Sequence, residues 1–282
     1  MELALLLAAE VQRNVLAALV EDIGGGDLTA LLSSATRRSL GTVISREDAV
    51  LAGSAWFDAC FRQLDPLAAI HWHAADGEAI AAGQTLCEIE ASTRALLTAE
   101  RAALNFLQLL SATATATRLY VNAVAGTGAR IVDTRKTLPG LRLAQKYAVT
   151  CGGGANHRLG LYDGILIKEN HIMATGGVTA ALHQAQAIGR NEVFIQIEVE
   201  TLEQLAEALD AGAKMILLDN MDLTQMRQAV GLTAGRAELE ASGGVSLETV
   251  RAIAEAGVDR ISIGGLTKNV RAIDLSLRHS EG

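Results

Sequence analysis

The order of hydrophobic and polar residues changes character along the chain. In the first third the pattern is short-ranged. Gly41–Arg46 and Ile70–His73 alternate as β-strands do, and Ser54–Leu64 predicts a helix capped by its own first residue. A long helix is expected to follow over Thr98–Val124, again with its first residue as the N-cap. This part of the chain is therefore predicted to mix helices with short strands.

Beyond that helix, short apolar runs typical of buried strands alternate with amphipathic helical segments. The expected strands are Arg130–Asp133, Gly164–Lys168, Val193–Glu198, Met215–Asp219, Glu238–Ser242 and Arg260–Gly264. The expected helices are Gly140–Thr150, Val178–Ile188, Leu202–Ala211, Leu223–Val230 and Leu247–Ala256. Strands that alternate with helices in this way predict a parallel sheet, because each helix carries the chain back to the start of the next strand.

Each predicted strand ends on a polar residue or a glycine. These residues are Asp133, Lys168, Glu198, Asp219, Ser242 and Gly264. In an α/β barrel the strand ends converge on one mouth, where active sites lie. We predict an α/β protein with a smaller N-terminal α+β domain over residues 1–112. A partly open α/β barrel of about six parallel strands is expected over residues 113–267, with the segment 268–282 packed back on the first domain.

The composition limits the classes of function. The 282 residues carry a net charge of -8, which argues against nucleic acid as a partner, because phosphate backbones need a basic face. Three scattered cysteines predict neither a disulfide framework nor a metal site. No apolar run reaches membrane-spanning length, and Met1–Val20 is typical of an amphipathic helix and not of a signal peptide. We expect a cytoplasmic protein without nucleic-acid or membrane partners.

Positive charge is concentrated in one stretch of this acidic chain. Between residues 130 and 171, only three acidic residues accompany the basic and histidine residues Arg130, Arg135, Lys136, Arg142, Lys146, His157, Arg158, Lys168 and His171. The run Gly152–Gly154 lets the backbone come close to a ligand, because glycine has no side chain. The pattern predicts a pocket that binds an anion.

Three motifs supply the cations of this pocket. Arg135 and Lys136 place a planar fork beside a point charge, a pair suited to carboxylate or phosphate; solvated ion pairs are the ordinary alternative. His157 and Arg158 follow the glycine run as two further cationic donors. Lys168, at the end of the second strand, could bind an anion, form a Schiff base or extend into solvent. Its basic neighbours favour the anion.

Carboxylates end the next two strands. Glu198 and Asp219 could serve as general acid and base, as metal ligands, as acceptors for ribose hydroxyls or as ion-pair partners of the lysines. We favour hydroxyl and Mg²⁺ binding, because anion-binding groups surround them. Glu200 lies on the same strand face as Glu198, so the sequence does not choose between the two.

Glycine pairs end the last two strands. Ser242, Gly243 and Gly244 follow one strand, and Gly264 and Gly265 follow the other. Exposed backbone N–H groups at such turns bind phosphate, and glycine loops after the final two strands are a recurrent phosphate site of α/β barrels. Two ordinary strand-to-helix turns are the alternative. The assembled mouth would hold a sugar phosphate that carries a pyrophosphate, together with an acidic cosubstrate.

At these residues the chain resembles the quinolinate phosphoribosyltransferase family. The resemblance covers nearly the whole chain in order and rests on long motifs. They are Glu21–Asp27, Glu100–Phe106, Asp133–Gly140, Lys146–Val149, Gly152–Asp163, Ile167–His171, Ile197–Glu200, Leu217–Asn220 and Ser242–Gly244. Departures are confined to Leu138 and Ala155, at variable positions, and to Gly265, where the family often has alanine. None of them removes a charged group.

The resemblance implies how one substrate is bound. Quinolinate, a pyridine dicarboxylate, would be held by Arg135, His157, Arg158 and Lys168. Arg101 would reach into the site from the other subunit of a homodimer. The products would be nicotinate mononucleotide, pyrophosphate and CO₂, in NAD biosynthesis.

The resemblance also implies how the second substrate is bound. Lys136, Lys168, Glu198 and Asp219 would handle phosphoribosyl pyrophosphate and its Mg²⁺, and the glycine loops would take the 5′-phosphate. No protein nucleophile is required.

Other hypotheses remain open at this point. A related phosphoribosyltransferase for another acid, such as the relatives encoded with molybdate transport, would keep the barrel and the phosphate loops; Asp133–Thr137 and Asn156–Arg158 favour quinolinate. A Schiff-base aldolase using Lys168 and a non-catalytic anion-binding protein are the remaining alternatives. The segment Asp76–Glu90 resembles the hairpin of biotinyl and lipoyl carrier domains, but the first lysine of the chain is Lys136, which excludes that role.

Overall fold

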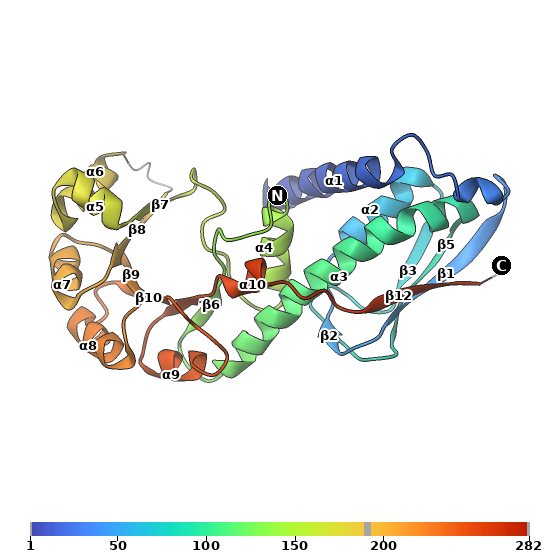
Figure 1. The fold of residues 1–282 in the computed structure, drawn as a ribbon. Helices are drawn as coiled ribbons and strands as arrows, with labels where there is room; N and C mark the ends of the chain where they lie inside the picture. The colour runs from blue at the N-terminus through green and yellow to red at the C-terminus, as the bar shows by residue number, and fades with distance from the viewer. Residues whose placement is uncertain (1, 189–192, 281–282) are drawn as a thin grey trace. The chain divides into compact units, whose positions relative to one another are not determined.

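The computed structural model describes residues 2–188 and 193–280, which form two compact units (Figure 1). The first unit holds the chain up to Arg118, together with Thr137–Gly153 and the residues from Leu266 onward. The second unit holds Leu119–Lys136 and Gly154–Gly265. Each unit is therefore built from segments that are distant in sequence. Within the described ranges, no helix has the length and apolar character needed to cross a membrane.

The first unit combines helices with antiparallel strands. Its helical segments are α1 (Glu2–Ile23), η1 (Ala30–Leu32), α2 (Ser54–Leu64), most of α3 (Thr93–Ala123), α4 (Arg142–Cys151) and most of α10 (Gly265–Lys268). Its strands are β1 (Arg38–Ser45), β2 (Ala49–Val50), β3 (Ala69–Trp72), β4 (Ala79–Ile80), β5 (Thr85–Ser92) and β12 (Leu275–Ser280). The larger sheet has the order β12-β1-β5-β3, and β2 pairs with β4. The C-terminal strand therefore pairs with the first strand, with Leu40 opposite Ser280.

Aromatic side chains fill the core of the first unit. Trp56, Phe57 and Phe61 are fully buried, and with Cys60 they form one stripe along α2. The indole N–H of Trp56 donates to Asn14 Oδ1 at 3.0 Å. Buried and exposed residues alternate along β1 and β5, so one face of the sheet turns toward this core.

The cap of α2 differs from the prediction. The helix begins at Ser54 as expected, but the Ser54 side chain makes no capping bond. Instead the carboxylate of Asp76 accepts hydrogen bonds from the backbone N–H groups of Gly53 at 2.9 Å and Ser54 at 3.2 Å. A cap supplied by a distant residue leaves no signal in the local sequence.

The long helix α3 begins at Thr93, earlier than the predicted N-cap Thr98. Ser92, the last residue of β5, accepts a hydrogen bond from the Ala95 backbone N–H at 3.2 Å and so stabilises the new start. The Thr98 hydroxyl donates to Asp27 Oδ2 at 2.8 Å. Its oxygen therefore serves a contact between segments and not the helix end.

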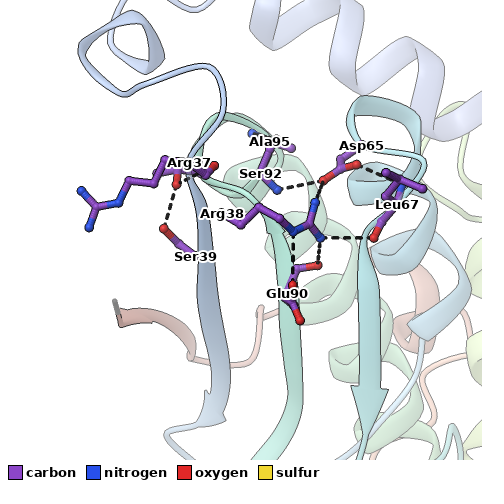
Figure 2. Close-up of polar contacts among 9 residues, drawn as sticks. Arg37, Arg38, Ser39, Asp65, Leu67, Glu90, Ser92 and Ala95 are labelled. Carbon is purple, nitrogen blue, oxygen red and sulfur yellow. Dashed lines mark hydrogen bonds and ion pairs between the residues drawn. The ribbon is translucent and has the colours of Figure 1, made fainter. Parts of the chain in front are cut away.

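Polar contacts hold the strand ends near the start of α3 (Figure 2). Arg38 of β1 donates to Glu90 Oε1 at 3.2 Å and to Asp65 Oδ2 at 3.3 Å. The same Asp65 oxygen accepts from the Ser92 backbone N–H at 2.8 Å. This backbone hydrogen bond is the largest of the interactions that lower the pKa of Asp65.

The second unit is a parallel sheet with helices outside it. Its strands are β6 (Arg130–Val132), β7 (Gly164–Ile167), β8 (Phe194–Val199), β9 (Met215–Asp219), β10 (Glu238–Ser242) and β11 (Arg260–Ser262). Its helices are α5 (Glu169–Thr175), α6 (Val178–Ile188), α7 (Leu202–Asp210), α8 (Leu223–Thr233) and α9 (Val250–Glu255), and Figure 1 shows α6 to α9 in a row outside the strands. The strand order is β6-β11-β10-β9-β8-β7, with all pairs parallel. The sheet is therefore open between β6 and β7, which confirms the predicted partly open barrel.

One helix differs from the predicted domain organisation. The sequence assigned Gly140–Thr150 to the barrel domain, but α4 belongs to the first unit, where Ala144 and Ala148 join the hydrophobic core. Gln145 of the same helix is buried and donates to Thr267 O at 2.7 Å. The first segment of the first unit ends within α3, at Arg118. An amphipathic pattern predicts an apolar helix face but not the core that receives it.

Candidate active site

The turn after β6 supplies the first two cations of the site. Arg135 and Lys136 line one pocket of the second unit. The Lys136 backbone N–H donates to Thr134 Oγ1 at 3.1 Å, which fixes the turn. A Cβ at Gly264 would lie 3.0 Å from Lys136 Cδ. The absence of a side chain at Gly264 therefore makes room for the lysine.

A buried aspartate holds the next motif against β6. Asp133 is fully buried and accepts from Asn156 Nδ2 at 2.7 Å and from the His157 backbone N–H at 2.9 Å. Ala155 forms a parallel bridge to Val132. These contacts place the residues that follow Gly154 along the free edge of β6, where they reach the same pocket.

The pocket brings together cations from three separate segments of the chain. Its lining consists of Arg135, Lys136, Arg158 and Lys168, of His157, Glu198 and Glu240, of the hydroxyl residues Thr134, Ser242 and Ser262, and of Leu166 and Leu217. Arg135, Arg158 and Lys168 thus share one hollow. Basic groups that converge in this way raise the local positive potential and attract an anion.

Two guanidinium groups, those of Arg135 and Arg158, lie in this pocket. Arg158 donates to Gly164 O at 3.1 Å, and neither Arg158 nor Arg135 forms an ion pair with a described carboxylate. The buried Nε of Arg135 has no hydrogen-bond partner among the described atoms. Burial, and then the charge of Arg135, lower the pKa of Arg158. The charge of Asp163 acts in the opposite direction on that pKa. Two like charges in one pocket, with no ion pair to a described carboxylate, indicate a site for a multiply charged anion.

The structure selects Glu198 over Glu200. Glu198 lines the pocket and lies 3.3 Å from Lys168 Nζ. Glu200 lies beyond the end of β8 with an exposed side chain, and its backbone N–H binds Gln204 Oε1 at 2.8 Å. The ion-paired, half-exposed Lys168 is unlike the desolvated lysine of a Schiff-base enzyme.

The turns after β9 and β10 contact each other, and of their predicted site residues Ser242 lines the pocket whereas Asp219, Gly243 and Gly244 do not. Asp219 ends β9 opposite Ser242 and accepts from Asn220 Nδ2 at 2.9 Å. Gly243 and Gly244 both have positive φ, and any side chain at Gly243 would overlap the Asn220 amide. α9 begins only at Val250, so the two glycine amides belong to a turn.

The remaining predicted residues also lie outside the lining of the pocket. Gly264 and Gly265 end the segment after β11, and Gly265 opens the short helix α10. Arg101 belongs to the first unit, where it lies exposed on α3 and lines a different hollow together with Glu21 and Asp22.

His157 lines the pocket, but both of its ring nitrogens face the protein. Nδ1 lies 2.7 Å from the Arg158 backbone N–H, and Nε2 lies 2.7 Å from Gln196 Oε1. Both ring nitrogens therefore contact protein groups, and the role of His157 as a cationic donor stays a prediction.

Sequence reasoning missed three polar residues at or beneath the pocket. Glu240 and Ser262 line it, and Gln196 is buried next to His157. A signal for Gln196 and Glu240 was present, because each precedes a predicted strand-end residue by two positions and so shares its face.

The described residues contain no group of three or more His, Cys, Asp or Glu side chains suited to a metal ion. Glu198 and Asp219 nevertheless belong to neighbouring strands, β8 and β9. Two carboxylates fit a hard cation that takes its other oxygens from a bound substrate.

Comparison with known proteins identifies relatives of the whole chain. The family model described as "Quinolinate phosphoribosyl transferase, N-terminal domain" matches residues 27–111, and its C-terminal counterpart matches residues 113–278. A "Probable nicotinate-nucleotide pyrophosphorylase [carboxylating]" of Bacillus subtilis is 41% identical over 92% of this chain and 89% of that protein. The chloroplastic enzyme of the same name from Arabidopsis thaliana is 39% identical over 93% of this chain and 80% of that protein.

Solved structures agree with the sequence relatives. The nicotinate-nucleotide pyrophosphorylase of Francisella tularensis has a TM-score of 0.94 and 42% identity, and the match covers 97% of each chain. NadC of Streptococcus pyogenes has a TM-score of 0.93 and 38% identity over 96% of each chain.

Proposed function

This chain belongs to the quinolinate phosphoribosyltransferase family, and from that premise we propose that it transfers the phosphoribosyl group of phosphoribosyl pyrophosphate to quinolinate. Nicotinate mononucleotide, pyrophosphate and CO₂ are the products, and the step belongs to NAD biosynthesis. The observation that carries this proposal is the pair of guanidinium groups, Arg135 and Arg158, in one pocket without an ion pair to any carboxylate that the structure describes. A dicarboxylate supplies the two negative charges that such a pair requires.

In this proposal different cations bind the two substrates. Arg135 and Arg158 bind the carboxylates of quinolinate, because a guanidinium matches a carboxylate in shape and charge. Lys168 supports them from the opposite edge strand, β7. Lys136 binds the pyrophosphate of the second substrate, and the turns at Ser242–Gly244 and at Gly264 and Gly265 take the 5′-phosphate.

The reaction requires alignment and charge stabilisation and no protein nucleophile. The pyridine nitrogen attacks the anomeric carbon, and the bond from that carbon to pyrophosphate breaks. Lys136 and Lys168 stabilise the negative charge on the departing group, while Glu198 and Asp219 bind ribose hydroxyls and face the cationic sugar. The bond from the ring to the adjacent carboxylate then breaks and releases CO₂. The quaternised nitrogen stabilises the resulting carbanion, which takes up a proton.

We further propose that Mg²⁺ enters the site with phosphoribosyl pyrophosphate, held by Glu198, Asp219 and substrate oxygens. Bound there, the ion would neutralise part of the pyrophosphate charge. Calorimetry can measure the binding of the Mg²⁺ complex of phosphoribosyl pyrophosphate without turnover. Asp219→Asn should weaken this binding and leave the affinity for quinolinate unchanged. Equal affinity of wild type and variant for the Mg²⁺ complex contradicts the assignment.

We propose a homodimer in which Arg101 completes the site of the partner subunit. Its exposure on α3 and its absence from the lining of the cation pocket support this arrangement. Mixing Arg101→Ala with Arg135→Ala protein should restore part of the activity, because one of the two sites in a mixed dimer is then intact. No recovery in isolated mixed dimers refutes sharing. We also propose that the protein is cytoplasmic.

The activity itself is tested by incubating the protein with quinolinate, phosphoribosyl pyrophosphate and Mg²⁺. We expect equal amounts of CO₂ and nicotinate mononucleotide. Nicotinate is the matched control, because it lacks the second carboxylate and should not react. Nucleotide formation from nicotinate at a comparable rate, or substrate binding without CO₂ release, contradicts the proposed reaction.

A further inference from the structure

A buried polar chain runs from the pocket into the interior of the second unit. His157 Nε2 lies 2.7 Å from Gln196 Oε1, and Gln196 Nε2 donates to Glu240 Oε2 at 3.2 Å. The Nε atom of Arg260 lies 3.1 Å from the same Glu240 oxygen. Gln196 and Glu240 are each 1% exposed, so water does not weaken these contacts. The mechanism proposed above assigns no role to either residue.

The groups at each end determine the direction of the hydrogen bonds. The Arg158 backbone N–H can only donate and lies 2.7 Å from His157 Nδ1, so Nδ1 carries a lone pair. The ring proton is then on Nε2 and donates to Gln196 Oε1. The Gln196 amide NH₂ remains for the Glu240 carboxylate, which only accepts. A doubly protonated ring would direct an N–H at the Arg158 N–H, so this network fits only the neutral ring.

Both acidic and basic groups lie around the His157 ring. Asp133 Oδ1 accepts the His157 backbone N–H at 2.9 Å, and Glu240 Oε2 lies 3.8 Å from Nε2. Arg135 and Arg158 share the pocket with the ring, and the charge of Arg135 already lowers the pKa of Arg158. A third cation at His157 would add to that repulsion.

We propose that Gln196, held by Glu240, fixes His157 as the neutral Nε2–H tautomer, so that Nδ1 anchors the Arg158 backbone and positions its guanidinium. His157 is then a positioning residue and not a cationic ligand of the substrate. The inference rests on the proposed function, in which Arg158 binds a carboxylate of quinolinate. It also explains why the barrel interior contains an amide and a carboxylate where apolar side chains would pack.

The tautomer can be measured directly by ¹⁵N NMR of protein labelled at its histidines. The chain contains 6 histidines, and His157→Asn identifies the signal that disappears. We expect an unprotonated Nδ1 and a protonated Nε2 from about pH 8 down to about pH 6. A doubly protonated ring, or a proton on Nδ1, overturns the proposal. No substrate is present, so this result does not depend on the proposed activity.

Two substitutions of His157 distinguish a role in anchoring the Arg158 backbone from a role as a charged ligand. His157→Asn keeps an acceptor near the position of Nδ1, whereas His157→Ala leaves the Arg158 N–H unpaired. We expect the KM for quinolinate to rise by less than about threefold in the first variant and by about tenfold or more in the second. The KM for phosphoribosyl pyrophosphate should change less in both. Equal losses in both variants, with equal Tm values, overturn the positioning role and restore the cationic one.

Gln196→Leu tests the link to the interior. Leucine has similar size but cannot accept the Nε2 proton, so the His157 ring should populate both tautomers in the ¹⁵N spectrum. The KM for quinolinate should move toward that of His157→Ala. An unchanged spectrum in folded Gln196→Leu protein shows that Gln196 does not fix the tautomer and overturns that part of the proposal.

Discussion

Both units bury apolar and polar side chains, but the aromatic cluster of the first unit and the polar groups behind the pocket of the second differ in kind. The first unit buries Trp56, Phe57 and Phe61 in an apolar core, whereas the second buries Gln196 on β8, Glu240 on β10 and Asp133 directly after β6. Apolar burial stabilises a fold without requiring partners. Buried polar groups destabilise it unless every one is hydrogen-bonded. The contrast indicates that the aromatic cluster supplies stability and that the buried polar groups behind the pocket sacrifice stability to hold a site.

The largest expected effect tests the apolar side of this comparison. Phe57→Ala removes a fully buried ring that packs 5.3 Å from the Trp72 ring, and it should lower the free energy of unfolding by about 3–5 kcal/mol. Urea unfolding followed by fluorescence measures it, because both tryptophans, Trp56 and Trp72, belong to the first unit. Leu67→Ala is the control, since Leu67 is 78% exposed. Equal stabilities in the two variants contradict the assignment.

Arg135→Ala tests the polar site of the second unit. Losing one charged hydrogen-bonding partner of a carboxylate should lower kcat/KM for quinolinate by about 10²–10³-fold, with little change in Tm. Steady-state kinetics and thermal unfolding measure the two quantities. Arg236→Ala serves as the matched control, because Arg236 lies in the same unit and pairs with Asp210 on the surface. Full activity of Arg135→Ala with unchanged quinolinate affinity disproves the proposed site.

A smaller effect distinguishes the observed helix cap from the predicted one. Asp76→Ala should destabilise the first unit by about 1–2 kcal/mol, because it removes the acceptor for the N–H groups at the start of α2. It also removes the acceptor of the Tyr147 hydroxyl at 2.7 Å. Ser54→Ala should change stability by less than about 0.5 kcal/mol. The reverse order in urea unfolding would favour the cap predicted from the sequence.

The smallest expected effect concerns acid stability in the first unit. The Ser92 backbone hydrogen bond lowers the pKa of Asp65, so the stability that Asp65 contributes is present above its unfolded pKa and is lost as the pH falls. Asp65→Asn should therefore flatten the fall in Tm below about pH 4. Burial raises the pKa of Asp58, so Asp58→Asn should act with the opposite sign. Parallel pH profiles of the two variants contradict this pairing.

Much of the second unit was predictable, because its signals are local. Met215–Asp219 and Glu238–Ser242 have the bounds that their apolar runs predict, and each run identifies a buried parallel strand. The helix α5 escaped prediction because none of its residues is buried, so it leaves no apolar periodicity. The cap at Asp76 and the position of α4 depend on distant partners, which no local pattern reports.

The site was predictable to a similar extent and for a similar reason. Charged residues at strand ends, such as Arg135 and Lys168, identified the pocket, because the ends of parallel strands meet at one edge. The proposed role of His157 was not predictable, since it depends on contacts with Gln196 and with the Arg158 backbone. Reading the polar residues inside the strands, and not only at their ends, would have suggested Gln196 and Glu240.

The strand order has a consequence for how the protein emerges from the ribosome. β6 has its sheet partner in β11, with Arg130 opposite Arg260, and the edge of the first sheet is completed by β12. Both sheets are therefore completed only when the last part of the chain has been synthesised, and strand edges remain unpaired until then. A ribosome that stalls before Arg260 releases a nascent chain with two incomplete sheets at once, a substrate for chaperones and proteases.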